Sequence, residues 1–226
     1  MLGPVRALDP FSLVVIPDTQ YDSDDPATLN ALTDWVVANR EAENIAFVSH
    51  VGDLVEWAPF GEPLSESRWD NIVTAMSRLD GQVPYGVVVG NHDYDLKNGG
   101  NTGMATRFLE NFGPERFLGQ SWYRGASPDG LNSYQVFMAG GREFLHLCLG
   151  FPGYPDGKRE AVNWAIPILE QHADVPTMIT THYYLEGKNQ YPANEDGRSD
   201  IGDTFWEDLI LRRDQVFMVT ICRTDR

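Results

Sequence analysis

Four apolar stretches of this 226-residue chain end in polar residues of types that can do chemistry. In chain order these residues are Asp18 and Gln20, then Asp53, then Asn91, His92 and Asp93, and finally His182. Carboxylate and amide oxygens together with an imidazole suit divalent Mn, Mg, Fe or Zn. An apolar strand has little use for such side chains at its exit, so they are candidates for a metal-dependent reaction.

A pair of divalent metals accounts for this combination of ligands. Two dications about 3.5–4 Å apart share one carboxylate, bind both ends of an in-line displacement and generate hydroxide. Asp53 is the candidate bridge, because Gly52 before it allows the backbone to approach closely. His92 is the candidate acid for a leaving alkoxide, and we expect Asp93 to orient its ring or raise its pKa.

Alternating strands and helices are predicted to position these residues. Short apolar runs predict strands at Leu13–Pro17, Ile45–Val48 and Val83–Val89. Asp25-Pro26 predicts the cap and first residue of one intervening helix, and the apolar stripe in Trp69–Leu79 predicts the other. This β-α-β-α-β order is typical of parallel strands, and the carboxyl ends of such strands carry ligand sites.

The second half of the chain predicts a hairpin, further helices and two more strands. Segment 98–132, rich in Gly, Asn and Pro, indicates a long excursion around one short helix. The predicted elements are a helix at Thr106–Phe112, a hairpin of Ser133–Met138 and Glu143–Leu149, a helix at Glu160–His172, a strand at Thr177–Thr181, a helix from its cap Asp203 to Arg213, and a strand at Val216–Ile221. No linker divides the chain, so we expect one domain over residues 1–226.

Composition argues against several classes of protein. An apolar content of 42% with 12% aromatic residues is typical of a globular domain. The formal net charge of −16 argues against a nucleic-acid partner. Of the two cysteines, which do not make a disulfide framework, Cys148 is expected in the core. Neither a signal peptide nor an apolar segment of membrane-spanning length is evident. We therefore expect a soluble protein without a membrane partner, either cytoplasmic or the mature form of a secreted or periplasmic protein.

The polar motifs resemble the signature of the calcineurin-like metallophosphoesterase family. That signature runs D-x-H, G-D-x-x-D/E, G-N-H-D/E, a lone His and G-H-x-H. The chain reads Asp18-Thr19-Gln20, then Gly52-Asp53-Leu54-Val55-Glu56, then Gly90-Asn91-His92-Asp93, then His182. The resemblance covers Leu13 to about Ile221, and it rests on four motifs in the family's order.

This resemblance implies an α/β (α+β) fold with a central β-sandwich flanked by helices. It also implies a binuclear metal centre and phosphoester hydrolysis. Carried over by motif, Asp18 and Gln20 would hold the first metal, and Asn91 and His182 the second. Asp53 would bridge the two ions. His92 would be the proton donor.

Two positions depart from the family signature. Gln20 replaces the usual His, so a neutral amide oxygen, which suits a harder metal, replaces an imidazole. Where G-H-x-H should follow the last strand, the chain reads Cys222-Arg223-Thr224-Asp225-Arg226. By its offset from the strand Asp225 is a candidate ligand, whereas the permanent cation of Arg223 is not. We therefore expect a domain that is incomplete at its C-terminus and lacks its last strands.

Three functions compete on these residues. The first is a metal-dependent phosphohydrolase that cleaves small phosphomonoesters or phosphodiesters by attack of a metal-bridging hydroxide. The second is a catalytically impaired protein or binding module that keeps the fold with an incomplete metal site. The third is a nuclease, which the net charge and the lack of a basic stripe disfavour. We predict the first, with two divalent ions of Mn, Fe, Zn or Mg.

Overall fold

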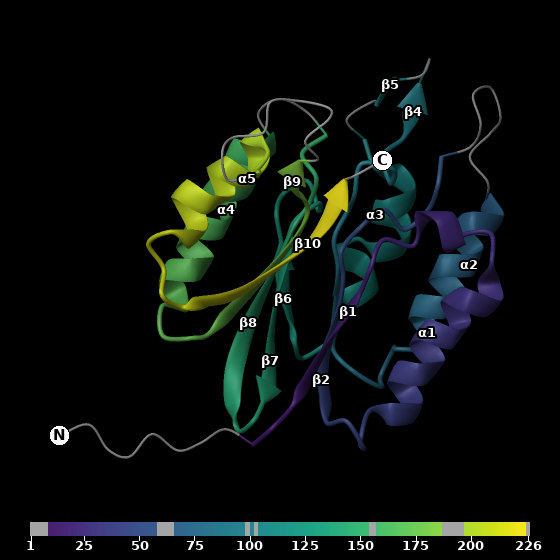
Figure 1. Ribbon diagram of the computed structural model, residues 1–226, viewed down its shortest axis with the longest axis horizontal. Helices are drawn as coiled ribbons and strands as arrows, with labels where there is room; N and C mark the ends of the chain where they lie inside the picture. Colours follow the sequence, from purple (N-terminus) through teal and green to yellow (C-terminus); the bar gives the residue numbers. More distant parts are fainter. Residues whose placement is uncertain are drawn as a thin grey trace.

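The computed structural model describes residues 9–57, 66–97, 100–101, 104–153, 157–186 and 197–224. Two β-sheets pack face to face, and helices cover the outer side of each sheet (Figure 1). This arrangement confirms the predicted fold class, a mixed α/β fold with a central sandwich flanked by helices. No helix in these ranges is both long and apolar enough to cross a membrane.

The first sheet consists of three parallel strands in the order β1-β2-β3. The strands are β1 (Ser12–Ile16), β2 (Ile45–His50) and β3 (Tyr85–Val87), and the connecting helices are α1 (Pro26–Asn39) and α2 (Glu66–Ser77). The predicted parallel order is confirmed. The third strand is shorter than the predicted Val83–Val89, because β3 runs only from Tyr85 to Val87. The start of α1 is also confirmed, because the carboxylate of Asp25 accepts from the backbone N–H groups of Ala27 and Thr28.

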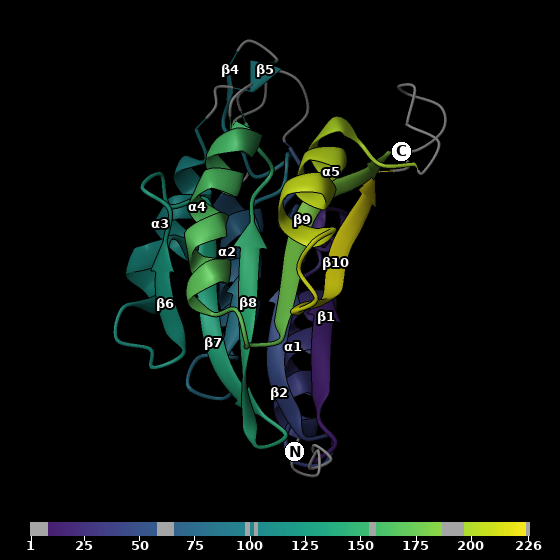
Figure 2. The same ribbon diagram turned by 90° about the vertical axis from the view of Figure 1, so that its left-hand side faces the viewer.

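The second sheet has five strands in the order β10-β9-β8-β7-β6. They are β6 (Tyr123–Ala126), β7 (Ser133–Ala139), β8 (Arg142–Leu149), β9 (Thr177–Glu186) and β10 (Val216–Thr224). The antiparallel pairing of β7 with β8 confirms the predicted hairpin, whereas β8, β9 and β10 run parallel. Helices α4 (Gly157–Gln171) and α5 (Asp200–Phe205) lie over the outer face of this sheet (Figure 2).

Two regions differ from the sequence prediction. Segment 98–132 was expected to hold one short helix, but it contains further elements. The elements in this segment and at its border are β4 (Leu96–Lys97), β5 (Gly100–Asn101), α3 (Thr106–Phe112), η2 (Pro114–Phe117) and β6. The last helix starts before Asp203, because Ser199 is its cap and accepts from the Gly202 N–H at 2.9 Å. It then continues into a π-helical turn, η3 (Trp206–Ile210). In the predicted loop 186–202, residues 187–196 lie outside the described ranges.

The space between the two sheets holds both apolar and polar side chains. Phe47 of β2 stacks on Phe137 of β7, with ring centroids 4.5 Å apart. Nearby, the hydroxyl of Ser49 lies 2.8 Å from the hydroxyl of Thr180 and 3.2 Å from Nε2 of His146. Burial lowers the pKa of His146 to about 3, so its ring is neutral and ties the two sheets by hydrogen bonds. The predicted core position of the Cys148 thiol is confirmed by an exposure of 1%.

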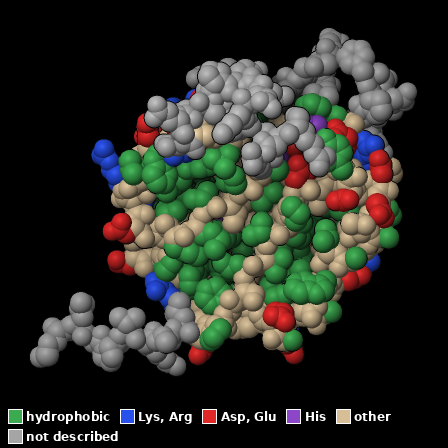
Figure 3. Space-filling model, viewed as in Figure 1, with side chains coloured by type: hydrophobic (Ala, Val, Ile, Leu, Met, Phe, Trp, Pro, Cys, Tyr) green, Lys and Arg blue, Asp and Glu red, His purple; other side chains and the backbone are tan. Residues whose placement is uncertain are grey.

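One side of the sandwich is open along β1 and β10. These are edge strands of the two sheets in the described ranges, and they lie side by side in both ribbon views. Apolar side chains are exposed across this face (Figure 3). Val15 of β1 is 41% exposed, and Phe217 and Met218 of β10 are 47% and 37% exposed. The edge of the inter-sheet space is therefore accessible to solvent here.

Candidate metal centre

The predicted ligands meet beyond the carboxyl ends of the first sheet, next to β9. Asp18 and Gln20 follow β1, Asp53 follows β2, and Asn91 follows β3. His182 lies inside β9, which is longer than predicted. Its Nε2 atom is 3.1 Å from Oδ2 of Asp53 and 3.1 Å from Oδ1 of Asn91. His182, Asp53 and Asn91 come from three motifs that are far apart in sequence, and His182 contacts both of the other two.

The ring of His182 is oriented as in a metal ligand. The side chain is fully buried, and Nδ1 lies 2.9 Å from the carbonyl oxygen of Val51. Because a carbonyl only accepts, Nδ1 carries a proton and Nε2 is directed toward the two oxygens. Burial lowers the pKa of His182, but the hydrogen bond and charge of Asp53 outweigh it and raise that pKa overall. The surroundings of Nε2 therefore favour positive charge, which either a proton or a metal ion can supply.

The spacing around His182 fits ligands of one ion. Two ligands about 2.0–2.1 Å from a metal, at right angles to each other, are about 2.9 Å apart. The observed separations from Nε2 of His182 to Asp53 and Asn91 are both 3.1 Å. Shifts of a few tenths of an ångström would let these three side chains hold a divalent ion.

The loop after β1 gives a second indication of a cation site. Gln20 is 7% exposed, and its side-chain oxygen Oε1 has no hydrogen-bond partner among the described residues. An unpaired buried acceptor costs about 1–3 kcal/mol. Oδ1 of Asp18 accepts from the Gln20 backbone N–H at 3.0 Å, and burial raises the pKa of Asp18. A metal ion here would satisfy Oε1 and compensate the buried carboxylate.

A metal centre at these residues would need amide oxygens. In the ranges that the structure covers, His, Cys, Asp and Glu side chains alone form no group of three arranged to hold a metal ion. The candidate ligands therefore include Gln20 and Asn91 in addition to the charged side chains. Asp225, the further candidate ligand, lies outside the described residues.

The backbone around Asp53 is strained. Gly52 has a φ of +94°, and Asp53 itself has a φ of +50°, a region that costs energy for a residue with a side chain. The close approach predicted for Gly52 is present, since an added Cβ would lie 2.9 Å from the backbone N of Gly90. In this conformation Oδ1 of Asp53 accepts from the His92 backbone N–H at 2.7 Å, while Oδ2 faces His182.

The carboxylate of Asp93 has other partners than the ring of His92 that the sequence predicted for it. Its buried carboxylate does not orient the ring of His92 but accepts from the backbone N–H groups of Leu54, at 2.8 Å, and Gly90, at 2.7 Å. Burial and the charge of Asp53 raise the pKa of Asp93 to about 8. Asp93 thus joins the two loops that carry metal-ligand candidates, which makes it a positioning residue.

Glu56 and Trp57 hold the ring of His92. Oε1 of Glu56 lies 2.9 Å from Nδ1 of His92. The imidazole also stacks on the indole of Trp57, with centroids 3.9 Å apart and planes 11° apart. Sequence reasoning did not assign these two residues to the site. The signal for Glu56 was its place as the final acidic residue of the G-D-x-x-D/E motif.

His50 supports the ligand loops from within the core. Burial lowers the pKa of His50 to about 3, so the ring is neutral. Its Nδ1 accepts from the Gly52 N–H at 3.1 Å, so Nε2 donates to the hydroxyl of Thr19 at 3.1 Å. That hydroxyl in turn donates to the carbonyl oxygen of Leu54, at 3.1 Å. These bonds connect the loop after β1 to the loop after β2.

Comparison with known proteins identifies the family. The family model described as calcineurin-like phosphoesterase matches residues 11–218. The chain belongs to the calcineurin-like phosphoesterase family. Members of this family typically bind a two-metal centre.

Three similar proteins each align with most of this chain. The uncharacterized protein YvnB of Bacillus subtilis is 29% identical over 215 residues, which are 94% of this chain and 15% of that protein. GAP50, described as the anchor in the inner membrane complex of Plasmodium, aligns with 14% identity and a TM-score of 0.49 over 92% of this chain and 64% of its own. A dimetal phosphatase from Danio rerio aligns with 14% identity and a TM-score of 0.45, and the alignment covers 89% of this chain and 78% of the phosphatase chain. The chain spans only a small part of the length of YvnB.

Replacing Gly90 with Ala is expected to disrupt the candidate metal centre. An added Cβ would overlap Oδ1 and the backbone N of Asp53, so this ligand has to move. We expect Mn²⁺ affinity to fall at least about 10-fold, and the free energy of unfolding to fall by about 1–3 kcal/mol. Calorimetric titration and thermal unfolding measure the two effects. Gly119→Ala is the control for Mn²⁺ affinity: its Cβ would meet open space away from the candidate ligands, while the φ of +84° at this position lets it lower stability without touching the centre. An unchanged Mn²⁺ affinity in Gly90→Ala would show that Asp53 is not a ligand.

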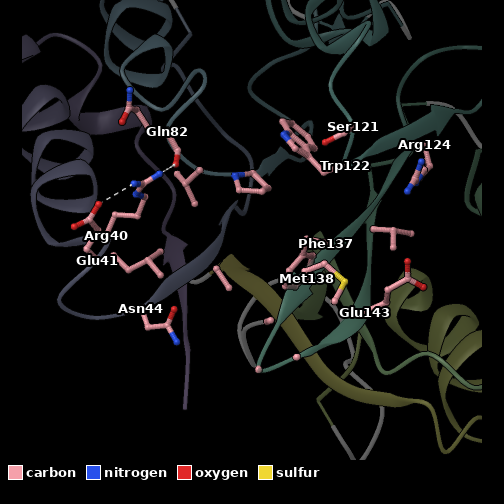
Figure 4. Close-up of a pocket in the computed structure, with 18 residues that line it drawn as sticks. Arg40, Glu41, Asn44, Gln82, Ser121, Trp122, Arg124, Phe137, Met138 and Glu143 are labelled. Carbon is pink, nitrogen blue, oxygen red and sulfur yellow. Dashed lines mark hydrogen bonds and ion pairs between the residues drawn. The ribbon is translucent and has the colours of Figure 1, made fainter. Parts of the chain in front are cut away.

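A separate hollow lies near the amino-terminal ends of β2 and β3. It has a volume of about 730 Å³, and its lining includes Arg40, Gln82, Trp122 and Phe137 (Figure 4). Nη1 of Arg40 donates to the carbonyl oxygen of Gln82 at its rim. None of the candidate ligands lines this hollow, and the candidate ligands lie at the opposite ends of these strands.

Proposed function

We propose that this chain is a metal-dependent phosphohydrolase that acts on small phosphomonoesters or phosphodiesters. Family membership supports the reaction class. The observation that carries the proposal is the buried Nε2 of His182, which lies 3.1 Å from oxygens of both Asp53 and Asn91, a set of donors that suits a divalent ion. Bound divalent ions would supply a nucleophilic water at neutral pH and neutralise charge on the phosphate.

We assign Asn91 and His182 to one ion, Asp18 and Gln20 to the other, and Asp53 to both. The contacts of His182 support the first group. The orphaned oxygen of Gln20 and the raised pKa of Asp18 support the second. Manganese is the first metal to test, because Mn²⁺ accepts the carboxylate, carbonyl-type and imidazole ligands that these residues offer.

His92 is the proposed proton donor to the departing alkoxide. The hydrogen bond to Glu56 occupies Nδ1, and stacking on Trp57 restricts rotation of the ring. Nε2 is then the ring nitrogen left for proton transfer. The backbone N–H of His92 donates to Asp53, so the donor and the proposed bridging ligand are held at a fixed separation.

The test combines a metal measurement with a hydrolysis assay. Protein stripped by a chelator is loaded with Mn²⁺, Zn²⁺ or Mg²⁺ and assayed with nitrophenyl phosphate and bis-nitrophenyl phosphate. We expect metal-dependent release of nitrophenol, and the ratio of the two rates separates monoesterase from diesterase activity. Bound metal without nitrophenol release with either ester would favour a family member that keeps the fold and has lost hydrolysis. Fewer than one bound metal per chain and no release would overturn the proposal.

A further inference from the structure

A thiol lies against one of the proposed metal ligands. Cys222, near the end of β10, has its Sγ 3.5 Å from Oδ2 of Asp18. The two residues are 204 positions apart in sequence, and they meet because β1 and β10 run side by side at the open edge of the sandwich. We propose that Cys222 ligates the same ion as Asp18 and Gln20. This inference rests on the proposed metal-dependent function.

The separation of the two atoms fits a shared ion. A zinc–sulfur bond of about 2.3 Å and a zinc–oxygen bond of about 2.0–2.2 Å, at a tetrahedral angle, place the two ligand atoms about 3.6 Å apart. The observed distance between Sγ of Cys222 and Oδ2 of Asp18 is 3.5 Å. A metal ion can therefore replace the hydrogen bond between them with little movement of either backbone. The thiol proton is released to solvent as the thiolate binds the metal.

The orphaned amide of Gln20 provides an independent indication of a ligand at this place. Gln20 is more than nine-tenths buried, and within the described ranges its Oε1 lacks a hydrogen-bond partner. Its backbone N–H donates to the other carboxylate oxygen of Asp18, so both residues belong to one turn. An amide oxygen, a carboxylate and a thiol are then three donors of suitable type for one ion.

Cys222 also changes the metal expected at this position. Gln20 alone favours a hard ion such as Mg²⁺, because it offers only oxygen. A thiolate is a soft ligand that favours Zn²⁺, Fe²⁺ or Co²⁺ over Mg²⁺. Compared with the family signature, the first ion would have the amide of Gln20 in place of an imidazole. The thiolate of Cys222 would add a sulfur donor from a different strand. The other thiol, Cys148, is 1% exposed and packs near Gln135 and His146.

Cobalt provides a direct readout, because Co²⁺ bound to a thiolate absorbs in the near ultraviolet through charge transfer. Metal-free protein, reduced with a phosphine, is titrated with Co²⁺, and bound metal is counted by equilibrium dialysis. We expect the band to saturate at one thiolate-bound Co²⁺ per chain. Cys222→Ser should lose the band and at least about 10-fold in affinity for the first ion. Since the chain has two cysteines, Cys148→Ala is the matched control and should keep the band.

The outcomes separate this inference from the proposed function. Cobalt binding without the band, or a band that survives in Cys222→Ser, would overturn ligation by Cys222 and leave the metal-dependent reaction in place. No binding of Co²⁺, Zn²⁺ or Mn²⁺ would overturn both. A band that is lost in Cys222→Ser and kept in Cys148→Ala supports ligation, whatever the hydrolysis rate.

Discussion

Replacing Asp53 with Asn should lower metal-dependent phosphoester hydrolysis by about 10²–10³-fold, the range for removing one preorganised electrostatic group. Asn keeps the shape of the side chain and tolerates the φ of +50° at this position, so the backbone should be retained. The variant loses the charge that faces Nε2 of His182 at 3.1 Å. Because Asp53 is the proposed shared ligand, both ions should bind more weakly.

Three measurements test this prediction: kcat/KM with a nitrophenyl ester, bound Mn²⁺ per chain and the thermal unfolding midpoint. We expect the first two to fall, while the midpoint of the metal-free protein stays near that of the parent. Asp22→Asn is the control, since it removes an exposed carboxylate from the loop after β1. Full activity and metal content in Asp53→Asn would contradict both the bridging role and the proposed reaction.

The convergence of the candidate ligands could be predicted because it depends on local pattern and strand order. Asp18, Asp53 and Asn91 each follow an apolar run, and parallel strands bring such exits to one edge. The sequence also indicated the close backbone approach at Gly52. A similar pattern placed His182 at the end of a strand, although β9 continues to Glu186. Despite that difference in length, His182 contacts Asp53 and Asn91, the candidate ligands that it was predicted to join.

The partners of these residues could not be predicted, because they depend on how loops and sheets pack. Asp93 follows His92 directly, yet its carboxylate turns toward the backbone amides of Leu54 and Gly90. Glu56 reaches His92 from a loop 36 residues earlier in the chain. The contact between Cys222 and Asp18 requires the edge strands of two different sheets to lie together. Each of these contacts depends on tertiary structure. Hydrophobic periodicity in a single sequence indicates helices and strands, but it does not indicate which side chains meet between them.

Glu56→Gln should slow hydrolysis selectively for substrates with poor leaving groups. An amide at this position still accepts from Nδ1 of His92, so the ring keeps its orientation but loses the adjacent negative charge. Protonation of the leaving oxygen is worth about 10²–10⁴-fold when that oxygen is basic, and far less when it belongs to nitrophenol. We therefore expect kcat/KM to fall at least about 10²-fold with alkyl phosphates, and much less with nitrophenyl phosphate.

The diagnostic quantity is the dependence of log kcat/KM on the acidity of the leaving alcohol, across a series from nitrophenol to simple alcohols. Loss of the proton donor makes this dependence steeper, because more charge then develops on the departing oxygen. His92→Gln removes the donor itself and should give the steepest line, with Glu56→Gln between it and the parent. An equal loss for every substrate would indicate that Glu56 acts on substrate binding or on the fold. In that case the contact between Glu56 and His92 would be structural, and the proton would have to come from another group.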